Sequence, residues 1–111
     1  MSGPSADERA YDRIVDEVGT RPGVGAGRIL SSEGLHYRGK YFVAPNRNGL
    51  LVKLPADRVV ELVDDGTGVP FETGRGRVMR EWVVIRPEHR RRWRSIALEA
   101  LAFAVRLAGT T

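Results

Sequence analysis

The spacing of hydrophobic residues predicts an amphipathic helix at the start of the chain. Ser5 and Glu8 have the spacing of a capping box, in which two side chains pair with backbone N–H groups at a helix start. Apolar residues then recur at positions i, i+3, i+4 and i+7, namely Tyr11, Ile14, Val15 and Val18. Gly19 is typical of a helix end. We therefore expect a helix over about residues 6–18, preceded by disorder at residues 1–4.

Short β-favouring runs follow between about residues 28 and 54. Apolar residues alternate with polar ones at 35–38, and residues 41–44 and 50–54 are further apolar runs. Residues 46–49 read Asn-Arg-Asn-Gly, which predicts a hairpin with a type I′ turn because Asn-Gly tolerates positive φ. Residues 21–27 are interpreted as a flexible glycine-rich connector, since their glycine spacing and the helix before them do not fit a phosphate-binding loop.

The second half of the chain predicts a helix, a loop, a strand and a long last helix. Pro55 suits the first turn of a helix that ends by Gly66. Residues 66–80 are rich in glycine and are expected to be a loop, whereas residues 81–85 are typical of a buried strand. The last helix is expected from Pro87 to about Leu107. The order is α-β-β-β-β-α-β-α, which predicts an α+β fold: a single domain over residues 1–111, an antiparallel sheet of about five strands with helices packed on it.

The last helix is expected to make two kinds of contact. Residues 96–105 contain one charged side chain, Glu99, and a helix that is apolar nearly all round must be buried on more than one side. Both central packing in the core and a homodimer contact through residues 96–107 would meet this requirement.

Composition excludes several classes of protein. The chain has no cysteine, so disulfides, thiolate catalysis and cysteine-ligated zinc are excluded. No stretch approaches the ~20 apolar residues that span a bilayer, and the acidic N-terminal residues do not resemble a secretory signal. A cytoplasmic protein without membrane contact is therefore expected.

The sequence carries no recognisable catalytic motif. His36 and His89 have no metal-ligating neighbour at helical spacing, and no Gly-x-Ser-x-Gly elbow is present. Asp64 and Asp65 lie side by side near a helix end, where solvated carboxylates are the simpler interpretation than half of a metal site. We therefore expect no enzyme activity, no metal and no cofactor.

Positive charge is concentrated in one segment. The chain has sixteen arginines and two lysines, and residues 74–94 hold eight of the arginines against only Glu81 and Glu88. On one helix, those after Pro87 would fan around most of its surface. The expected basic patch consists of Arg75, Arg77, Arg80, Arg86, Arg90, Arg91, Arg92 and Arg94. Its partner is left open between an acidic protein surface, nucleic acid, and simple solvation or pairing with the acidic first helix.

A second group of residues carries a resemblance to a known family. Its members are the Gly39–Phe42 turn together with Lys53, Pro55, Phe71, Gly74, Gly76, Met79 and Trp82. Over roughly residues 10–107 the chain resembles the TfoX N-terminal domain family, named for the TfoX/Sxy competence regulators and related to YjbR-like domains. The resemblance implies a small α+β domain without known enzyme activity, in regulators that act with a transcription factor. Those regulators carry a second, C-terminal domain, which this chain is expected to lack.

The sequence thus favours a non-enzymatic regulatory or adaptor domain, linked by the resemblance to transcription regulation. The alternative is direct nucleic-acid binding through the Arg-rich segment 75–94. A third hypothesis is a small-molecule site under the loop 66–76, beside Phe71 and Trp82. The residues that carry the resemblance are themselves interpreted mainly as structural, with Met79 and Trp82 plugging the open end of the core.

Overall fold

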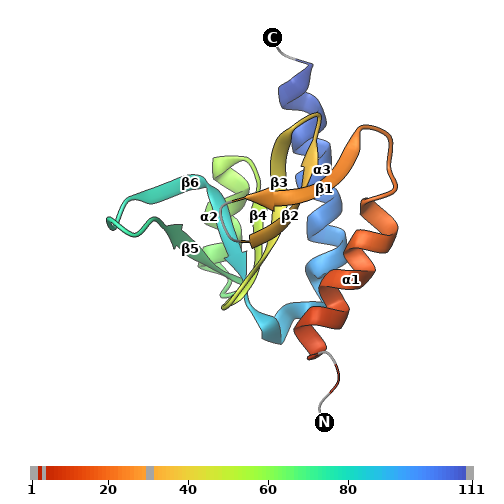
Figure 1. Ribbon diagram of the computed structural model, residues 1–111. Coiled ribbons are helices and arrows are strands. Elements are labelled where there is room, and N and C mark those ends of the chain that lie inside the picture. Colours follow the sequence, from red (N-terminus) through yellow and green to blue (C-terminus); the bar gives the residue numbers. More distant parts are fainter. Residues whose placement is uncertain (1–2, 4, 30–31, 110–111) are drawn as a thin grey trace.

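The computed structural model describes residue 3, residues 5–29 and residues 32–109 (Figure 1). Its elements in chain order are α1 (Ala6–Val18), β1 (Val24–Ile29), β2 (Ser32–Tyr37), β3 (Lys40–Asn46), β4 (Gly49–Lys53), α2 (Ala56–Asp64), β5 (Gly68–Glu72), β6 (Val78–Ile85), the 3₁₀ helix η1 (Pro87–Arg92) and α3 (Trp93–Ala108). The expected α+β class with an antiparallel sheet is confirmed, although the described residues form six strands rather than about five. The expected disorder of residues 1–4 falls mostly outside the described residues.

The six strands lie in the order β1-β2-β3-β4-β6-β5, and all neighbours are antiparallel. The first four strands follow one another as hairpins. The chain then passes through α2 to the edge of the sheet, where β5 forms, and β6 returns between β4 and β5. Figure 1 shows the β5–β6 hairpin projecting away from α1 and α3.

One face of the sheet packs against the helices. Leu50 and Val52 of β4 pair with Ile85 and Val83 of β6, and all four side chains are fully buried. Along each strand they alternate with residues whose side chains point to the opposite face of the sheet, as the two-residue period of a strand requires. The helix α3 contacts β2, β3 and β4, α1 lies beside α3, and α2 packs on β5 and β6 (Figure 1).

The first helix forms as predicted. It begins at Ala6 after Ser5, whose side chain accepts a hydrogen bond from the Glu8 backbone N–H at 3.1 Å, while the Glu8 carboxylate accepts one from the Ser5 N–H at 3.0 Å. Bonding to Ser5 lowers the pKa of Glu8, because it stabilises the charged carboxylate. Tyr11, Ile14 and Val18 form the buried face.

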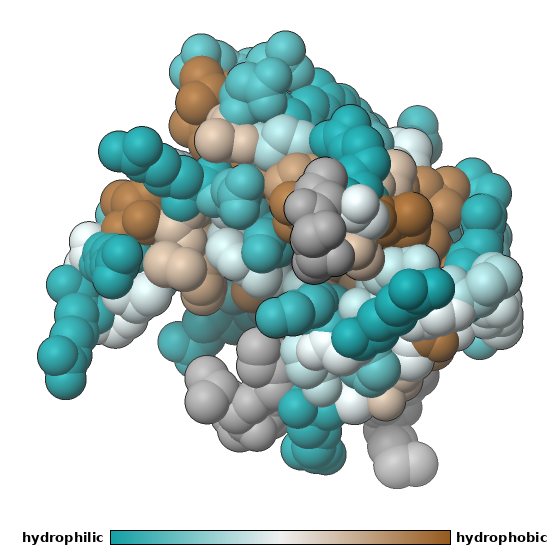
Figure 2. Space-filling model, turned by 90° about the horizontal axis from the view of Figure 1, so that it is seen from above, coloured by the Kyte–Doolittle hydropathy of each residue, from teal (hydrophilic) through white to brown (hydrophobic). Residues whose placement is uncertain are grey.

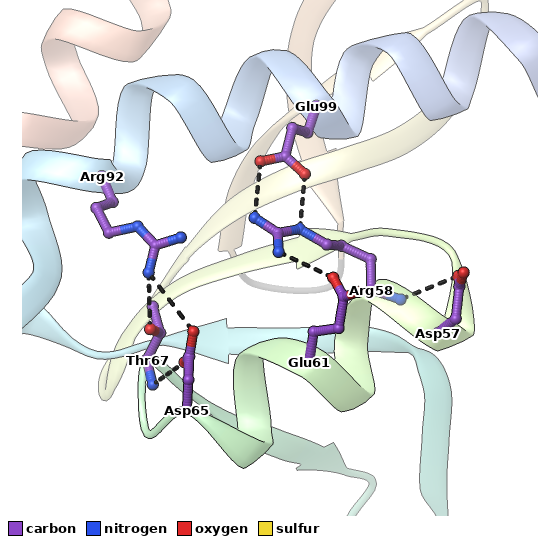
Figure 3. Close-up of polar contacts among 7 residues, drawn as sticks. All are labelled: Asp57, Arg58, Glu61, Asp65, Thr67, Arg92 and Glu99. Atoms are coloured by element: carbon purple, nitrogen blue, oxygen red, sulfur yellow. Dashed lines mark hydrogen bonds and ion pairs between the residues drawn. The ribbon is translucent and has the colours of Figure 1, made fainter.

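An ion pair joins α2 to α3 (Figure 3). Arg58 donates to both carboxylate oxygens of Glu99, from Nε at 2.9 Å and from Nη2 at 3.2 Å, and its Nη1 donates to Glu61 at 3.0 Å. Bidentate pairing of this kind is geometrically specific as well as charge-assisted. The single charge in the apolar stretch of α3 therefore fixes its rotation relative to α2.

The glycine-rich connector predicted for residues 21–27 is wrong for its second half, because residues 24–27 belong to β1. Aromatic rings from neighbouring strands lie over its glycines. A Cβ at Gly25 would be 2.7 Å from the His36 ring, and one at Gly27 would be 2.6 Å from the Tyr41 hydroxyl oxygen. That hydroxyl donates to the Arg28 carbonyl at 2.9 Å. These glycines make room for rings that lie on the strand.

The predicted loop over residues 66–80 is also partly wrong, because residues 68–72 form β5 and residues 78–80 already belong to β6, which was predicted to begin at residue 81. This strand lies at the edge of the sheet and pairs with β6 alone. Proline is tolerated on an edge strand because one side of the strand has no partner to receive its N–H. Pro70 and the surrounding glycines are typical of a loop, but at the edge of a sheet they are compatible with a strand.

The hairpin predicted at residues 46–49 is present, but its turn is not of type I′. Asn46 pairs with Gly49 across a two-residue loop, and Arg38 is the one described non-glycine residue with positive φ. Positive φ at two successive residues occurs instead at Arg38 (49°) and Gly39 (87°), which join β2 to β3. That combination is the requirement of a type I′ turn.

The last helix begins later than predicted. Residues 87–92 form the 3₁₀ helix η1, in which His89 has non-helical angles (φ −107°, ψ 27°), and α3 starts only at Trp93. A 3₁₀ segment has three residues per turn rather than 3.6. The arginines of η1 therefore do not continue the helical positions of α3, and the continuous arginine fan expected on one helix is wrong.

The surface carries few large apolar side chains. Those that are exposed among the described residues are Val60, Val78, Val105 and Leu107. Seen from above, the surface is mostly hydrophilic, with separate hydrophobic patches between long hydrophilic side chains (Figure 2). None of the described helices has the length and apolarity needed to cross a bilayer.

Gly49 provides a test of the close contact between the β3–β4 turn and β6. A Cβ at this position would lie 2.0 Å from the Ile85 carbonyl oxygen, and the residue has φ of 143°. We expect Gly49→Ala to lower the free energy of unfolding by about 2–4 kcal/mol, from strain and overpacking together. Gly74→Ala is the control, because nothing lies within 4 Å of its Cβ position. Equal urea midpoints for the two variants would contradict this packing.

Candidate functional site

Two arginines of the expected basic patch are paired with the acidic first helix. The Nη1 of Arg90 lies 2.8 Å from the Asp7 carboxylate, and Arg94 is hydrogen-bonded to Glu17. Cations are unfavourable at the start of a helix, where the dipole is positive, unless they are neutralised. Here α1 supplies the neutralising charge. These pairs join segments that are far apart in the sequence.

A third arginine anchors the turn between α2 and β5 (Figure 3). The Nη1 of Arg92 donates to the Thr67 hydroxyl at 2.8 Å and lies 4.0 Å from Asp65. Hydrogen bonds from the side chain and backbone of Thr67 lower the pKa of Asp65. Arg86 makes only an exposed contact with nearby Glu88, at 3.7 Å, and exposed pairs of this kind contribute little stability.

The other half of the expected patch makes no ion pair among the described residues. Its members are exposed and stand on the β5–β6 turn, on β6 and on η1: Arg75, Arg77, Arg80 and Arg91. Arg91 lies apart from the other three, in a shallow groove of about 250 Å³ between η1 and α1. The structure therefore divides the eight arginines between internal clamps and two separate surfaces.

Three of the residues that carry the family resemblance meet beside β6. Lys53 pairs with Trp82 across β4 and β6, and its ammonium lies 5.9 Å from the centre of the indole ring. Met79 and Trp82 are half-buried and line a groove of about 500 Å³ next to α2. A cavity beside Trp82 is thus present, but Phe71 does not line it and Pro70 is its one lining residue from the loop 66–76. The interpretation of Met79 and Trp82 as plugs of the core is wrong, because both lie outside the core cluster.

The remaining residues of that group have structural positions. Pro55 precedes the first residue of α2, and Phe71 is half-buried on β5. Gly76 has φ of 76° in the β5–β6 turn, a conformation that favours glycine. Gly74 is exposed in the same turn.

A second cavity lies beside the C-terminal turn of α3 and was not predicted from the sequence. It has a volume of about 370 Å³, and its apolar lining includes Phe42 and Phe103. Its charged lining residues come from the β2–β3 turn, from β3 and from β4: Arg38, Lys40 and Lys53. We call it the cationic pocket. As far as the described residues form it, its lining contains no carboxylate.

The β2–β3 hairpin positions this lining. The positive φ values of Arg38 and Gly39 close the turn, and the Arg38 guanidinium lies 5.4 Å from the Tyr37 ring centre. The pairing of β2 with β3 shifts at Phe42, which is left without a partner and is fully buried. Bulges of this kind redirect side chains, and here one places the Phe42 ring in the hydrophobic core that underlies the pocket.

The charge of the cationic pocket is largely unbalanced. Arg38, Lys40 and Lys53 make no ion pair among the described residues. The C-terminal turn of α3 forms one wall, and a helix C-terminus carries roughly half a negative charge. Three cations against about half a charge leave the pocket strongly positive. One signal in the sequence points to it: both lysines of this arginine-rich chain line this pocket.

The described part of the chain offers no constellation for metal binding: no three histidine or carboxylate side chains in it gather closely enough to hold an ion. Comparison with protein-family models, with curated proteins and with solved structures gave no match. The resemblance to the TfoX N-terminal domain therefore stays a prediction.

The Asp65 carboxylate gives a pH-dependent test of the clamp at the α2–β5 turn. Because its pKa is lower in the folded protein than the ordinary 3.8, its contribution to stability is present above that value and is lost as pH falls through the folded pKa. We expect Asp65→Asn to lower the urea midpoint at pH 7 and to converge with the unmodified protein as the pH falls below 4. The adjacent Asp64→Asn, which removes no described hydrogen bond, should show no such convergence.

Proposed function

We propose that this chain is a non-enzymatic binding domain, with a regulatory or adaptor role, that takes an acidic segment of a partner protein in the cationic pocket. The observation that carries the proposal is the set of three unpaired cations around an apolar floor without a carboxylate. Unpaired like charges in one pocket repel each other, and an anionic ligand relieves that repulsion.

The size and chemistry of the pocket favour a particular kind of segment. A volume of about 370 Å³ lies at the small end of ligand sites and suits one large side chain rather than a cofactor. Phe103 and Leu107, which have accessible surface in the lining, would pack on an apolar side chain of the partner. Arg38, Lys40 and Lys53 would bind carboxylates on either side of it, with the Arg38 guanidinium suited to a bidentate contact.

Nucleic-acid binding is a second candidate, supported by the three unpaired arginines of the β5–β6 hairpin, Arg75, Arg77 and Arg80. It is less favoured because Arg86, Arg90, Arg92 and Arg94 of the same segment already contact carboxylates of this chain. Binding of a duplex gains affinity from arginines and lysines that neutralise phosphates, and an arginine that is already paired within the chain must first leave its partner.

A charge-removal variant tests the proposal. In Arg38→Asn/Lys40→Gln/Lys53→Gln the pocket loses its cations, and asparagine tolerates the positive φ of position 38. The probe is a fluorescent synthetic peptide of alternating glutamate and leucine. We expect its dissociation constant, measured by anisotropy, to rise about tenfold or more, because several charge-assisted contacts are lost.

The matched control is Arg13→Gln/Arg28→Gln/Arg47→Gln, which removes the same net charge from positions outside the pocket. Equal weakening in both variants would show that net charge alone attracts the peptide, and the proposal would fail. A fluorescent DNA duplex separates the second candidate. Tight, salt-steep binding that disappears in Arg75→Gln/Arg77→Gln/Arg80→Gln would favour nucleic acid instead.

A further inference from the structure

The groove beside Trp82 lies between the helix α2 and the strand β6, and we call it the α2–β6 groove. Its first wall is α2, through Val59, Val60 and Val63, and its second is β6, through Val78 and Met79 together with the Trp82 ring. The groove has a volume of about 500 Å³ and a mainly apolar lining. It is separate from the cationic pocket, since the two share no lining residue.

The two most exposed large apolar side chains among the described residues lie on these two walls. Among the described residues Val60 is 56% exposed and Val78 is 51% exposed, more than any other large hydrophobic residue. Surface valines are common singly, but two that flank one apolar groove form a contiguous patch. Such a patch is typical of a protein interface.

The rims of the groove carry opposite charges. Asp57 and Asp64 lie on the α2 side, and Arg80 lies on the β6 side. None of the three has an ion pair among the described residues. Within the described parts of the chain, the Asp57 carboxylate accepts one hydrogen bond, from the backbone N–H of Arg58. An occupant that satisfies both rims must therefore present a cation to α2 and an anion to β6.

We propose that the occupant is a second copy of this chain, docked about a two-fold axis that passes through the α2–β6 groove. In a two-fold interface each residue of one copy that contacts a residue of the other is matched by the reciprocal contact. Arg80 of each copy then meets the acidic rim of the other, around Asp64. The projecting β5–β6 hairpin (Figure 1) brings the Val78 wall of each copy into the groove of its partner.

Other arrangements fit the surface less well. The acidic segment proposed for the cationic pocket would meet Asp57 and Asp64 and be repelled. The α3 surface over residues 96–107 has most of its apolar side chains, such as Ile96, Ala100 and Leu101, buried in the core of its own chain. This inference is independent of the proposed function, although a dimer would present two cationic pockets to a bivalent partner.

The test uses complementary charge reversal in analytical ultracentrifugation. The unmodified protein should sediment as a monomer–dimer mixture whose average mass rises with concentration. Arg80→Glu alone and Asp64→Arg alone should each be monomeric, because each places like charges across the interface. An equimolar mixture of the two variants should recover the dimer, since residue 64 of one then meets residue 80 of the other with opposite charge at both contacts.

Apolar variants distinguish the two candidate faces. Val60→Ser/Val78→Ser should abolish the dimer, whereas Val105→Ser, which changes a 44%-exposed side chain on α3, should leave it intact. The fluorescence emission of Trp82 should shift on dimerisation, because its ring lines the groove. Trp93 is buried in the monomer at 2% exposure, so its emission contributes a constant background. Circular dichroism checks that each variant is folded.

Three outcomes would overturn the inference. These are an unmodified protein that stays monomeric up to millimolar concentration, charge variants that fail to associate when mixed although each is folded, and a dimer that is lost in Val105→Ser instead. The cationic-pocket variant Arg38→Asn/Lys40→Gln/Lys53→Gln should dimerise normally, so failure of one proposal leaves the other standing.

Discussion

The burial of α3 across the sheet is the constraint on which the rest of the structure depends. Trp93, Ile96, Ala97 and Ala100 are all buried on it, and the small alanines let the helix lie close to β3 and β4. A helix that is apolar over so much of its surface needs cover on several sides. The sheet covers one side and α1 a second, and the bidentate contact of Arg58 with Glu99 joins α3 to α2.

That constraint also decides what the arginines do. The chain enters α3 through η1, where three consecutive arginines would face the positive end of a helix dipole. Arg90 and Arg94 bond to α1, and Arg92 bonds to the turn before β5. The densest positive segment of the sequence is thus used largely to hold the elements around α3. Besides the exposed arginines of the β5–β6 hairpin and Arg91, positive charge without an ion pair lies at the opposite end of α3, where no carboxylate lines the described part of the cationic pocket.

Features that depend on local chemistry could be predicted from the sequence, and features that depend on strand neighbours could not. The capping box and apolar stripe of α1 are contained within a few residues, so its bounds were predicted correctly. The strand β1 pairs with β2, and its glycines leave room for rings from β2 and β3, while β5 pairs with β6 alone; none of these neighbours is visible in the local sequence. The pairing of β3 with β4 could be predicted from the hairpin at residues 46–49, but the register shift between β2 and β3 and the position of the C-terminal turn of α3, which complete the cationic pocket, could not.

The two proposed surfaces differ in their charges, since one carries cations only and the other carries both signs, and this difference is the basis for proposing different partners. A pocket with charges of one sign repels its own copy, so the cationic pocket suits a foreign acidic segment and resists self-association. A segment of one sign satisfies only one rim of a groove that has an acidic and a basic rim, whereas such a groove is complementary to itself when turned about a two-fold axis. Because the two linings share no residue, the proposed binding of a second copy at α2 and β6 would not compete with the proposed binding of an acidic partner beside the end of α3.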